Sequence, residues 1–355
     1  MPYLKELCSR TNMNNPANAL WKLTAFREEF RQKPSELVDI QESKIAYHAG
    51  ATLEQAQPVG HSVIEVNNRE DLQAVLNTNA GSGKTLFLRA GEYRLKQSLT
   101  IPSDIHICGE GRSTVLICEP TIRTAAILLG DLDAKNITIE NLVVDGSKEH
   151  QDAYDPNSGR FYRTGRYSNA LAGISMRGEA GHAFSNIKLK NLTVINFSRS
   201  GVYISDAEGI EIHHCDFTEN GAHVVPGPRL QHNLMIQHSS NIMIKDSRFD
   251  TSIRGCGLVL DHCKSLKVEN CEIARNGWHG LLMAECHNGK IENCLVEGND
   301  GCGFMGEYLH DGSNLIQIRH NKIQYNNEYG IRAFGMKETD IKDLSLIHIS
   351  EPTRP

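Results

Sequence analysis

Ionisable side chains recur at regular steps in the middle of this 355-residue chain. His238, His262 and Glu285 follow one another at intervals of roughly two dozen residues, and each comes directly after a short apolar segment. Asp261 precedes one of them, and Tyr203 lies in the corresponding segment upstream. A histidine can take a proton near neutral pH, and a tyrosine hydroxyl can give one. These residue types at this interval indicate acid–base chemistry on a repeating surface.

The segments that carry these residues are halves of one repeating unit, which is clearest at Arg254–Asn276. The apolar spacing of two, together with Gly, Asn and β-branched residues at every corner, favours short strands over helical repeats. The first halves, most of them led by glycine, are Gly173–Met176, Gly201–Ile204, Asn233–Ile236, Gly257–Leu260, Gly280–Met283, Gly303–Gly306 and Gly330–Ala333. The second halves are Ile137–Asn141, Ile187–Asn191, Ile210–His214, Ile242–Asp246, Leu266–Asn270 and Ile291–Asn293.

Short strands at a period of one coil predict a parallel β-helix, whose coils stack at the ~4.8 Å strand spacing. Identical positions then form ladders. The expected corner ladder is Asn141, Asn191, His214, Asp246, Asn270 and Asn293, and the core column beside it is Leu142, Leu192, Cys215, Ser247, Cys271 and Cys294.

With these repeats, the chain resembles the pectate-lyase-like superfamily of right-handed parallel β-helices over roughly residues 60 to 343. The turn at Gly91 and the string GEGRSTVL from Gly109 resemble turns that commonly separate the strands in that superfamily. The resemblance implies an all-β solenoid, and its right-handedness comes from the resemblance alone.

Three regions are expected. Residues 1–60 hold a helix over 15–32, which we interpret as an N-terminal cap on the open end of the solenoid, followed by a polar connector. Residues 61–343 form the β-helix domain. Residues 344–355 break the repeat and resemble a translated sequencing adapter, so we interpret them as a non-native tail. A chain truncated there is expected to be a monomer that aggregates through its uncapped last coil.

Composition excludes several classes of partner. The net charge is −6 without a basic stripe, which argues against nucleic acid. No apolar stretch is long enough for a membrane span, and the first residues lack a secretory signal, so a cytoplasmic location is the default, although the superfamily is often secreted. The cysteines show no zinc-binding spacing. We predict no metal ligand set and no required cofactor, and Ca²⁺ stays open.

Two insertions, 147–169 and 221–231, interrupt the repeat just before a Gly-led segment. Long polar loops on a rigid scaffold are places where binding residues gather. The first insertion contains Tyr162, Arg163 and Arg166, a mixture that suits sugar rings and carboxylates. The expected partner is a polysaccharide.

The superfamily resemblance implies uronate chemistry as the leading interpretation. A lyase or C5-epimerase needs a base, a cation that neutralises the neighbouring carboxylate, and an acid. His238 or His262 is the expected base and Tyr203 the acid. The expected cation is Arg254, Arg177 or an arginine of the first insertion. The expected substrate contacts are Arg177, Asp206, His232, His279, Glu307 and the three insertion residues named above.

Two alternatives stay open. A glycosidase would pair Asp261 with Glu285 or Glu307, since coil spacing allows carboxyl separations of ~5–5.5 Å or ~6.5–9.5 Å. A non-catalytic, carbohydrate-binding β-helix would use the same side chains only as surface groups.

Overall fold

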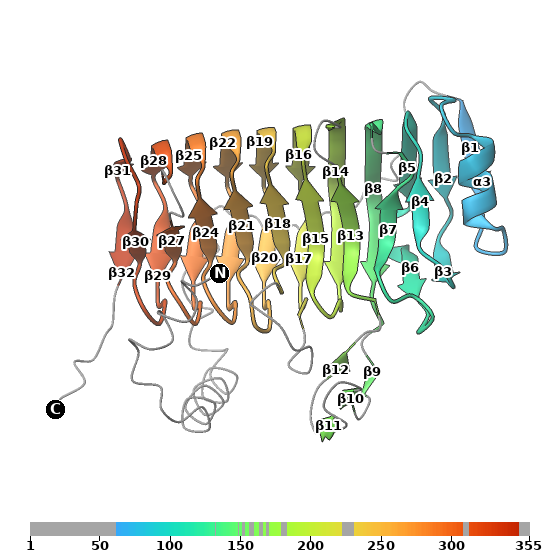
Figure 1. The fold of residues 1–355 in the computed structure, drawn as a ribbon. Coiled ribbons are helices and arrows are strands. Elements are labelled where there is room, and N and C mark those ends of the chain that lie inside the picture. Colours follow the sequence, from blue (N-terminus) through green and yellow to red (C-terminus); the bar gives the residue numbers. More distant parts are fainter. Residues whose placement is uncertain are drawn as a thin grey trace. The chain divides into compact units, whose positions relative to one another are not determined.

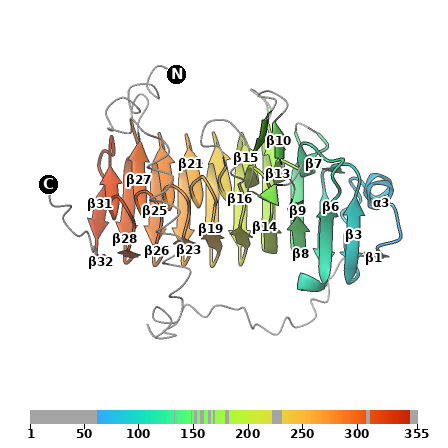
Figure 2. The ribbon, with the colours of Figure 1, turned by 90° about the horizontal axis from the view of Figure 1, so that it is seen from below.

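The computed structural model describes residues 62–131, 133–147, 170–178, 183–221, 231–307 and 312–347, with the backbone of four short strands between 149 and 167. These residues form a parallel β-solenoid whose coils follow one another in a single row (Figure 1). The same row is seen from below in Figure 2. The helix expected over 15–32 lies outside the described residues.

The chain enters the solenoid through a strand, a short helix and a second strand. These are β1 (Val63–Val66), α3 (Leu72–Thr78) and β2 (Thr85–Leu88). The side chain of Asp71 caps the helix by accepting a hydrogen bond from the backbone N–H of Ala74 at 3.1 Å. In the part of the chain that the structure describes, no helix is long and apolar enough to cross a bilayer.

One face of the solenoid is a nine-stranded parallel sheet that contains the Gly-led segments. Its strands are β4 (Leu99–Ile101), β7 (Ala125–Leu129), β13 (Ala172–Arg177), β15 (Ser200–Ser205), β18 (Leu234–Gln237), β21 (Leu258–Asp261), β24 (Leu281–Ala284), β27 (Phe304–Glu307) and β30 (Ile331–Ala333). Side chains alternate along each strand, so Leu258 and Leu260 point into the core and Val259 points out.

The second half of each coil supplies the remaining strands. Those following the nine-stranded sheet are β5 (Ile105–Gly109), β8 (Lys135–Asp145), β14 (Phe184–Ile195), β16 (Ala207–His213), β19 (Ser240–Lys245), β22 (Lys264–Glu269), β25 (His287–Glu292), β28 (Asn314–Arg319) and β31 (Asp340–Lys342). The last strands of the coils are β3 (Gly91–Leu95), β6 (Thr114–Cys118), β17 (Asp216–Thr218), β20 (Arg248–Asp250), β23 (Glu272–Ala274), β26 (Leu295–Glu297), β29 (Lys322–Gln324) and β32 (Ser345–Ile347). A 3₁₀ turn, η1 (Gly111–Ser113), precedes β6.

Two short hairpins lie within the first insertion. They pair β9 (Glu149–His150) with β12 (Arg166–Tyr167), and β10 (Ala153–Asp155) with β11 (Arg160–Tyr162). Most of the second insertion, residues 222–230, lies outside the described residues.

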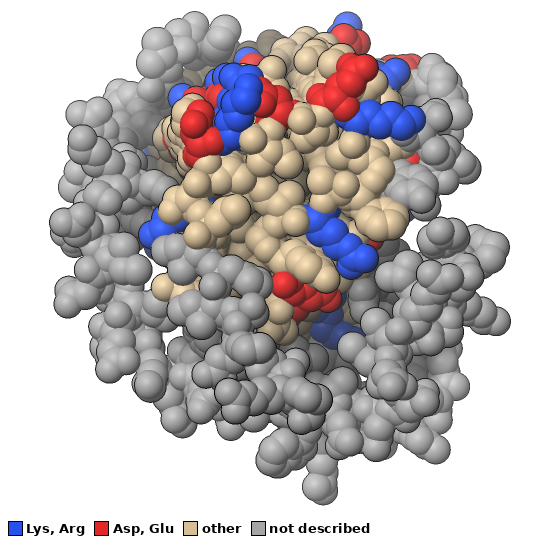
Figure 3. All heavy atoms as spheres, turned by 90° about the vertical axis from the view of Figure 1, so that its left-hand side faces the viewer, with Lys and Arg blue, Asp and Glu red and all other residues tan. Residues whose placement is uncertain are grey.

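The C-terminal end continues the parallel pairing past residue 343, because β32 pairs with β29. Apolar side chains are exposed at this end, among them Tyr329, Phe334, Ile341 and Leu346. Figure 3 views the end directly: charged residues gather along its upper edge, and the middle is mostly other residues with a few charged ones among them.

The corner ladder has the predicted form. Its members adopt left-handed backbone angles, with φ between 48° and 57°, which Asn, Asp and His tolerate better than most residues. Asn191 Nδ2 donates to Asn141 Oδ1 at 2.7 Å, and Asn270 Nδ2 donates to Asp246 Oδ1 at 3.0 Å. The neighbouring column is buried, including Cys215, as expected. All nine described cysteines are buried free thiols.

A second, buried asparagine ladder was not predicted, and it explains the glycine column. Its members are Asn220, Asn233, Asn276, Asn299 and Asn326, joined by side-chain hydrogen bonds of 2.8–3.1 Å. A Cβ on Gly257 would lie 2.6 Å from Asn276 Nδ2, so only glycine fits beside the ladder. In the coil that begins at Asn233, asparagine stands where most other coils have glycine, and Ser252 stands where they have the ladder asparagine. The Asn233 side chain bonds to both Asn220 and Asn276, so the ladder continues through this coil.

Candidate functional site

The outward rows of the nine-stranded sheet are aligned as the sequence predicts. Parallel pairing puts Arg177 beside Ser205, Ser205 beside Gln237, and Gln237 beside Asp261. Asp261 pairs with Ala284, which pairs with Glu307. This polar row runs along the solenoid at the carboxyl ends of the strands, one residue per coil.

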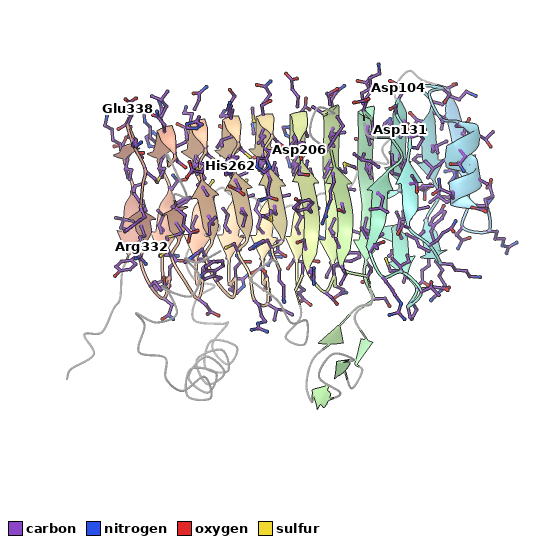
Figure 4. All side chains as sticks on the ribbon, viewed as in Figure 1. Asp104, Asp131, Asp206, His262, Arg332 and Glu338 are labelled. Carbon is purple, nitrogen blue, oxygen red and sulfur yellow. The ribbon has the colours of Figure 1, made fainter. Side chains whose placement is uncertain are left out.

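The row just beyond it turns the chain out of the sheet. Asp206, His238, His262 and Glu285 each have a left-handed backbone, with φ between 46° and 60°. Figure 4 labels Asp206 and His262 at the ends of β15 and β21, on the same edge of the sheet. This conformation brings the side chain of His262 back to Asp261, the residue before it.

A chain of hydrogen bonds joins three consecutive coils. The Tyr203 hydroxyl donates to Gln237 Oε1 at 2.7 Å, and Gln237 Nε2 donates to Asp261 Oδ2 at 2.7 Å. The other Asp261 oxygen, Oδ1, lies 2.7 Å from His262 Nδ1. Gln237 was not predicted from the sequence as a site residue. Its position in the polar row, one coil before Asp261, could have indicated it.

The pair of Asp261 and His262 has the geometry of an oriented base. A carboxylate only accepts hydrogen bonds, so His262 Nδ1 carries the proton and, in the neutral ring, Nε2 holds the lone pair. The His262 side chain is 38% exposed, against 18% for Asp261. The His238 ring packs against the His262 ring, with centroids 4.9 Å apart and planes at 38°. The His262 ring is therefore held on two sides and partly open to solvent.

Arg177 supplies a cation at the other end of this group. Its guanidinium carbon lies 4.6 Å from the centre of the Tyr203 ring, a cation–π contact, and its side chain is exposed. Arg177, Tyr203, Gln237, Asp261, His262 and His238 thus form one connected surface group, which we name the dyad face.

The outer side of the sheet beside the dyad face is apolar. Met235, Val259, Leu282 and Met305 form one row that packs with Tyr203 and Trp278. Each of the four is at most 8% exposed. An apolar bed of this kind lowers the local dielectric and strengthens charge interactions above it.

Three residues predicted from the sequence are buried rather than presented on the surface. His232 and His279 are each 3% exposed, and their Nδ1 atoms accept backbone N–H groups from Cys256 at 3.0 Å and Cys302 at 2.9 Å. Glu285 is also buried, and its Oε2 accepts the N–H of Gly312 at 2.9 Å. These contacts satisfy groups within the stack of coils.

The remaining predicted residues are not among the bonded members of the dyad face, or their side chains are not described. Arg254 is exposed between β20 and β21, Asp206 is half-buried at its corner, and Glu307 is half-buried at the end of β27. Tyr162 and Arg166 fall in the insertion strands, whose side chains are not described, and Arg163 lies outside the described residues.

A second group of ionisable side chains was not singled out from the sequence. It lies on the outer side of β17, β20 and β23, and we name it the arginine–carboxylate face: Asp216, Arg248, Asp250, Glu272 and Arg275. Arg275 Nη2 lies 2.6 Å from Asp250 Oδ2 and 3.6 Å from Glu272 Oε1, and Arg248 also contacts Asp250. Burial raises the pKa of Glu272 to about 7, although the charge of Arg275 opposes the rise.

Comparison with known proteins identifies the fold. A family model described as right handed beta helix region matches residues 131–343. No curated protein matches. The surface adhesin PfbA of Streptococcus pneumoniae has a similar structure, with a TM-score of 0.59 and 11% identity over 80% of this chain and 77% of that chain. The family 28 exopolygalacturonase of Yersinia enterocolitica gives 0.54 and 13% over 80% and 66%.

A third similar structure, the A-module of the mannuronan C-5 epimerase AlgE6 of Azotobacter vinelandii, gives a TM-score of 0.40 and 13% identity over 78% of this chain and 79% of that chain. Identities this low carry information about the fold alone. The family match covers more than half of the chain and confirms the resemblance to pectate-lyase-like proteins, so the chain belongs to the right-handed parallel β-helix family.

Proposed function

We propose that the chain acts on a polysaccharide containing uronic acid, and that it removes the C5 proton of the sugar at the dyad face. The observation that carries this proposal is the 2.7 Å contact between Asp261 Oδ1 and His262 Nδ1, which orients a partly exposed imidazole and leaves Nε2 to take a proton. An oriented histidine of this kind is the usual general base of proton-abstraction enzymes.

His262 and Tyr203 of the dyad face supply the base and the acid of an elimination. His262 Nε2 takes the C5 proton, and Asp261 stabilises the imidazolium that forms. Negative charge then develops on the carboxylate of the same sugar, and Arg254, outside the dyad face, is the cation assigned to neutralise it. In elimination, the C4–O bond breaks as the C4=C5 bond forms, and the Tyr203 hydroxyl protonates the departing oxygen. In epimerisation, an acid instead protonates C5 from the opposite side.

The polar row supports a substrate that lies along the solenoid axis. Coils repeat at the ~4.8 Å strand spacing, which is close to the length of one sugar unit in an extended polymer. Arg177 and Asp261 lie three coils apart in the same row. A polymer in this orientation would bring one carboxylate to Arg177 while another sugar meets His262.

The exopolygalacturonase among the similar structures, which is named for its action on polygalacturonate, supports an acidic polysaccharide as the substrate class. It also keeps hydrolysis as a second candidate. Asp261 and Glu307 lie two coils apart in one row, roughly 9–10 Å between backbones. This spacing suits the carboxylate pair of an inverting glycosidase.

Proton NMR of the chain with uronic-acid polysaccharides in D₂O distinguishes these activities. Unsaturated chain ends identify elimination, and deuterium at C5 without cleavage identifies epimerisation. New saturated reducing ends would instead indicate hydrolysis and contradict the proposal. Saturable binding without any covalent change would assign the dyad face to recognition, as in a surface adhesin.

A further inference from the structure

A group of three potential metal ligands lies far along the chain from the dyad face, on the outer side of β5 and β8. His106 and Cys108 are two residues apart on β5, so both side chains point outward from the same strand. Glu140, on the next coil, pairs directly with Cys108. The three donor atoms all lie within 4.8 Å of one another.

From this geometry we propose that His106, Cys108 and Glu140 bind a borderline transition-metal ion, with Zn²⁺ the best match. An imidazole nitrogen, a thiolate and a carboxylate are the three ligand types that zinc accepts in proteins, and three protein ligands leave a fourth position for water. Ligand bonds of about 2.0–2.3 Å require donor atoms about 3.3–3.8 Å apart in a tetrahedral site. The three donor atoms, all within 4.8 Å of one another, would adjust to these separations when the ion binds.

The surroundings orient the histidine for this role. His106 Nε2 lies 2.9 Å from Glu140 Oε1, and Nδ1 lies 3.0 Å from the Thr85 hydroxyl. When Nε2 binds the metal, Nδ1 carries the proton and donates it to the Thr85 oxygen. A hydrogen bond to the second ring nitrogen is the usual way in which proteins fix a metal-binding histidine.

The site has both a buried and an open side. Cys108 is 1% exposed, whereas the side chains of His106 and Glu140 are 27% and 23% exposed. Metal can therefore enter past the histidine and the carboxylate and reach the thiol. Binding converts the thiol to a thiolate and releases one proton to solvent.

A second group with similar composition serves as an internal control. His279, Cys302 and Glu328 also have donor atoms within 4.8 Å. There, however, His279 Nδ1 accepts the backbone N–H of Cys302 at 2.9 Å, and the histidine and cysteine are both buried. We assign the metal to the first group.

Titration of the whole 355-residue chain with Co²⁺, followed by absorption, tests the proposal. One equivalent should produce a thiolate-to-cobalt charge-transfer band that Zn²⁺ displaces. The band should disappear in Cys108→Ser and weaken in His106→Gln and Glu140→Gln, while Cys302→Ser keeps it. Thr85→Val should weaken the metal affinity ~10–100-fold.

Circular dichroism and thermal melting of the metal-free variants control for folding. Because His106 and Glu140 are partly exposed, their variants report on the site even if Cys108→Ser fails to fold. Absence of saturable cobalt binding by the wild-type chain would overturn the proposal. So would a band that survives in both His106→Gln and Glu140→Gln but disappears in Cys302→Ser.

Discussion

The dyad face and the arginine–carboxylate face are two rows of ionisable side chains produced by the same repeat, yet their environments differ. On the dyad face, the Asp261 carboxylate is bonded to a glutamine and a histidine, and the histidine is substantially exposed. On the arginine–carboxylate face, Asp250 and Glu272 are 3% and 6% exposed and lie against two arginines. Stacked coils therefore align charges in both places, but on the described side chains of these two faces only the first holds an exposed histidine against a carboxylate.

This difference shows how a solenoid separates stabilising charges from reactive ones. Burying a carboxylate costs free energy that a paired arginine offsets only in part. The raised pKa of Glu272 is the result of that cost. The dyad face instead orients its histidine through a short hydrogen bond and leaves the ring partly exposed, which suits the proton transfer that we propose.

The largest expected effect is a loss of turnover in the His262→Asn variant. Asparagine tolerates the left-handed backbone at this corner, so the fold should be retained while the base is lost. We expect a ~10²–10⁴-fold fall in kcat on the uronate polymer, measured by initial rates. His214→Asn is the matched control, because His214 has the same backbone conformation at the other corner and lies 3.9 Å from Asp246. Equal losses in the two variants would refute the assignment.

The next effect concerns stability and pH on the arginine–carboxylate face. Between about pH 4.5 and 7 the folded chain keeps a proton on Glu272 that the unfolded chain releases. Stability should therefore fall as pH rises through this window and stay level above it. Glu272→Gln removes this dependence. On going from pH 5 to pH 8, its free energy of unfolding should therefore rise relative to that of the wild type by on the order of 2 kcal/mol.

Urea unfolding of both proteins at the two pH values measures this difference. Glu92→Gln controls for the general loss of a carboxylate, since the Glu92 side chain is 58% exposed. A gain of the same size in the control would mean that the burial of Glu272 is not the cause.

A smaller effect is expected at Arg177. Arg177→Gln removes the cation that meets the uronate carboxylate but keeps the Tyr203 hydroxyl and the base. We expect KM to rise by about tenfold, equivalent to ~1.4 kcal/mol of binding, with a smaller change in kcat. Steady-state kinetics provide the measurement, and Arg94→Gln, at an exposed arginine on the far end of the solenoid, is the comparison. An unchanged KM would remove Arg177 from the site.

Much of this architecture was predictable from the sequence, because a solenoid repeats its local rules in every coil. The corner ladder at Asn191 and Asn270, the buried Cys215 column and the polar row through Asp261 all follow from counting alternate residues. The burial of His232 and His279 could not be foreseen, because the residue before Asn233 or Gly280 is drawn inward to accept an N–H group from the next coil. A linear pattern does not reveal that bond.

The links between residues were equally hidden. Gln237 looks like an ordinary polar side chain until its neighbours on adjacent coils are known to be Tyr203 and Asp261. The asparagine ladder through Asn233 was missed because one coil exchanges the asparagine and glycine positions, which breaks the apparent period. Such contacts depend on register between coils, which the sequence specifies only indirectly.

A crystal structure of the His262→Asn variant with a uronic-acid oligosaccharide tests the central claim most directly, because the variant should bind substrate without consuming it. The account predicts sugar density along the polar row, with a carboxylate at Arg177 and a C5 atom facing position 262. Density over Arg248 and Glu272, with the dyad face empty, would contradict it.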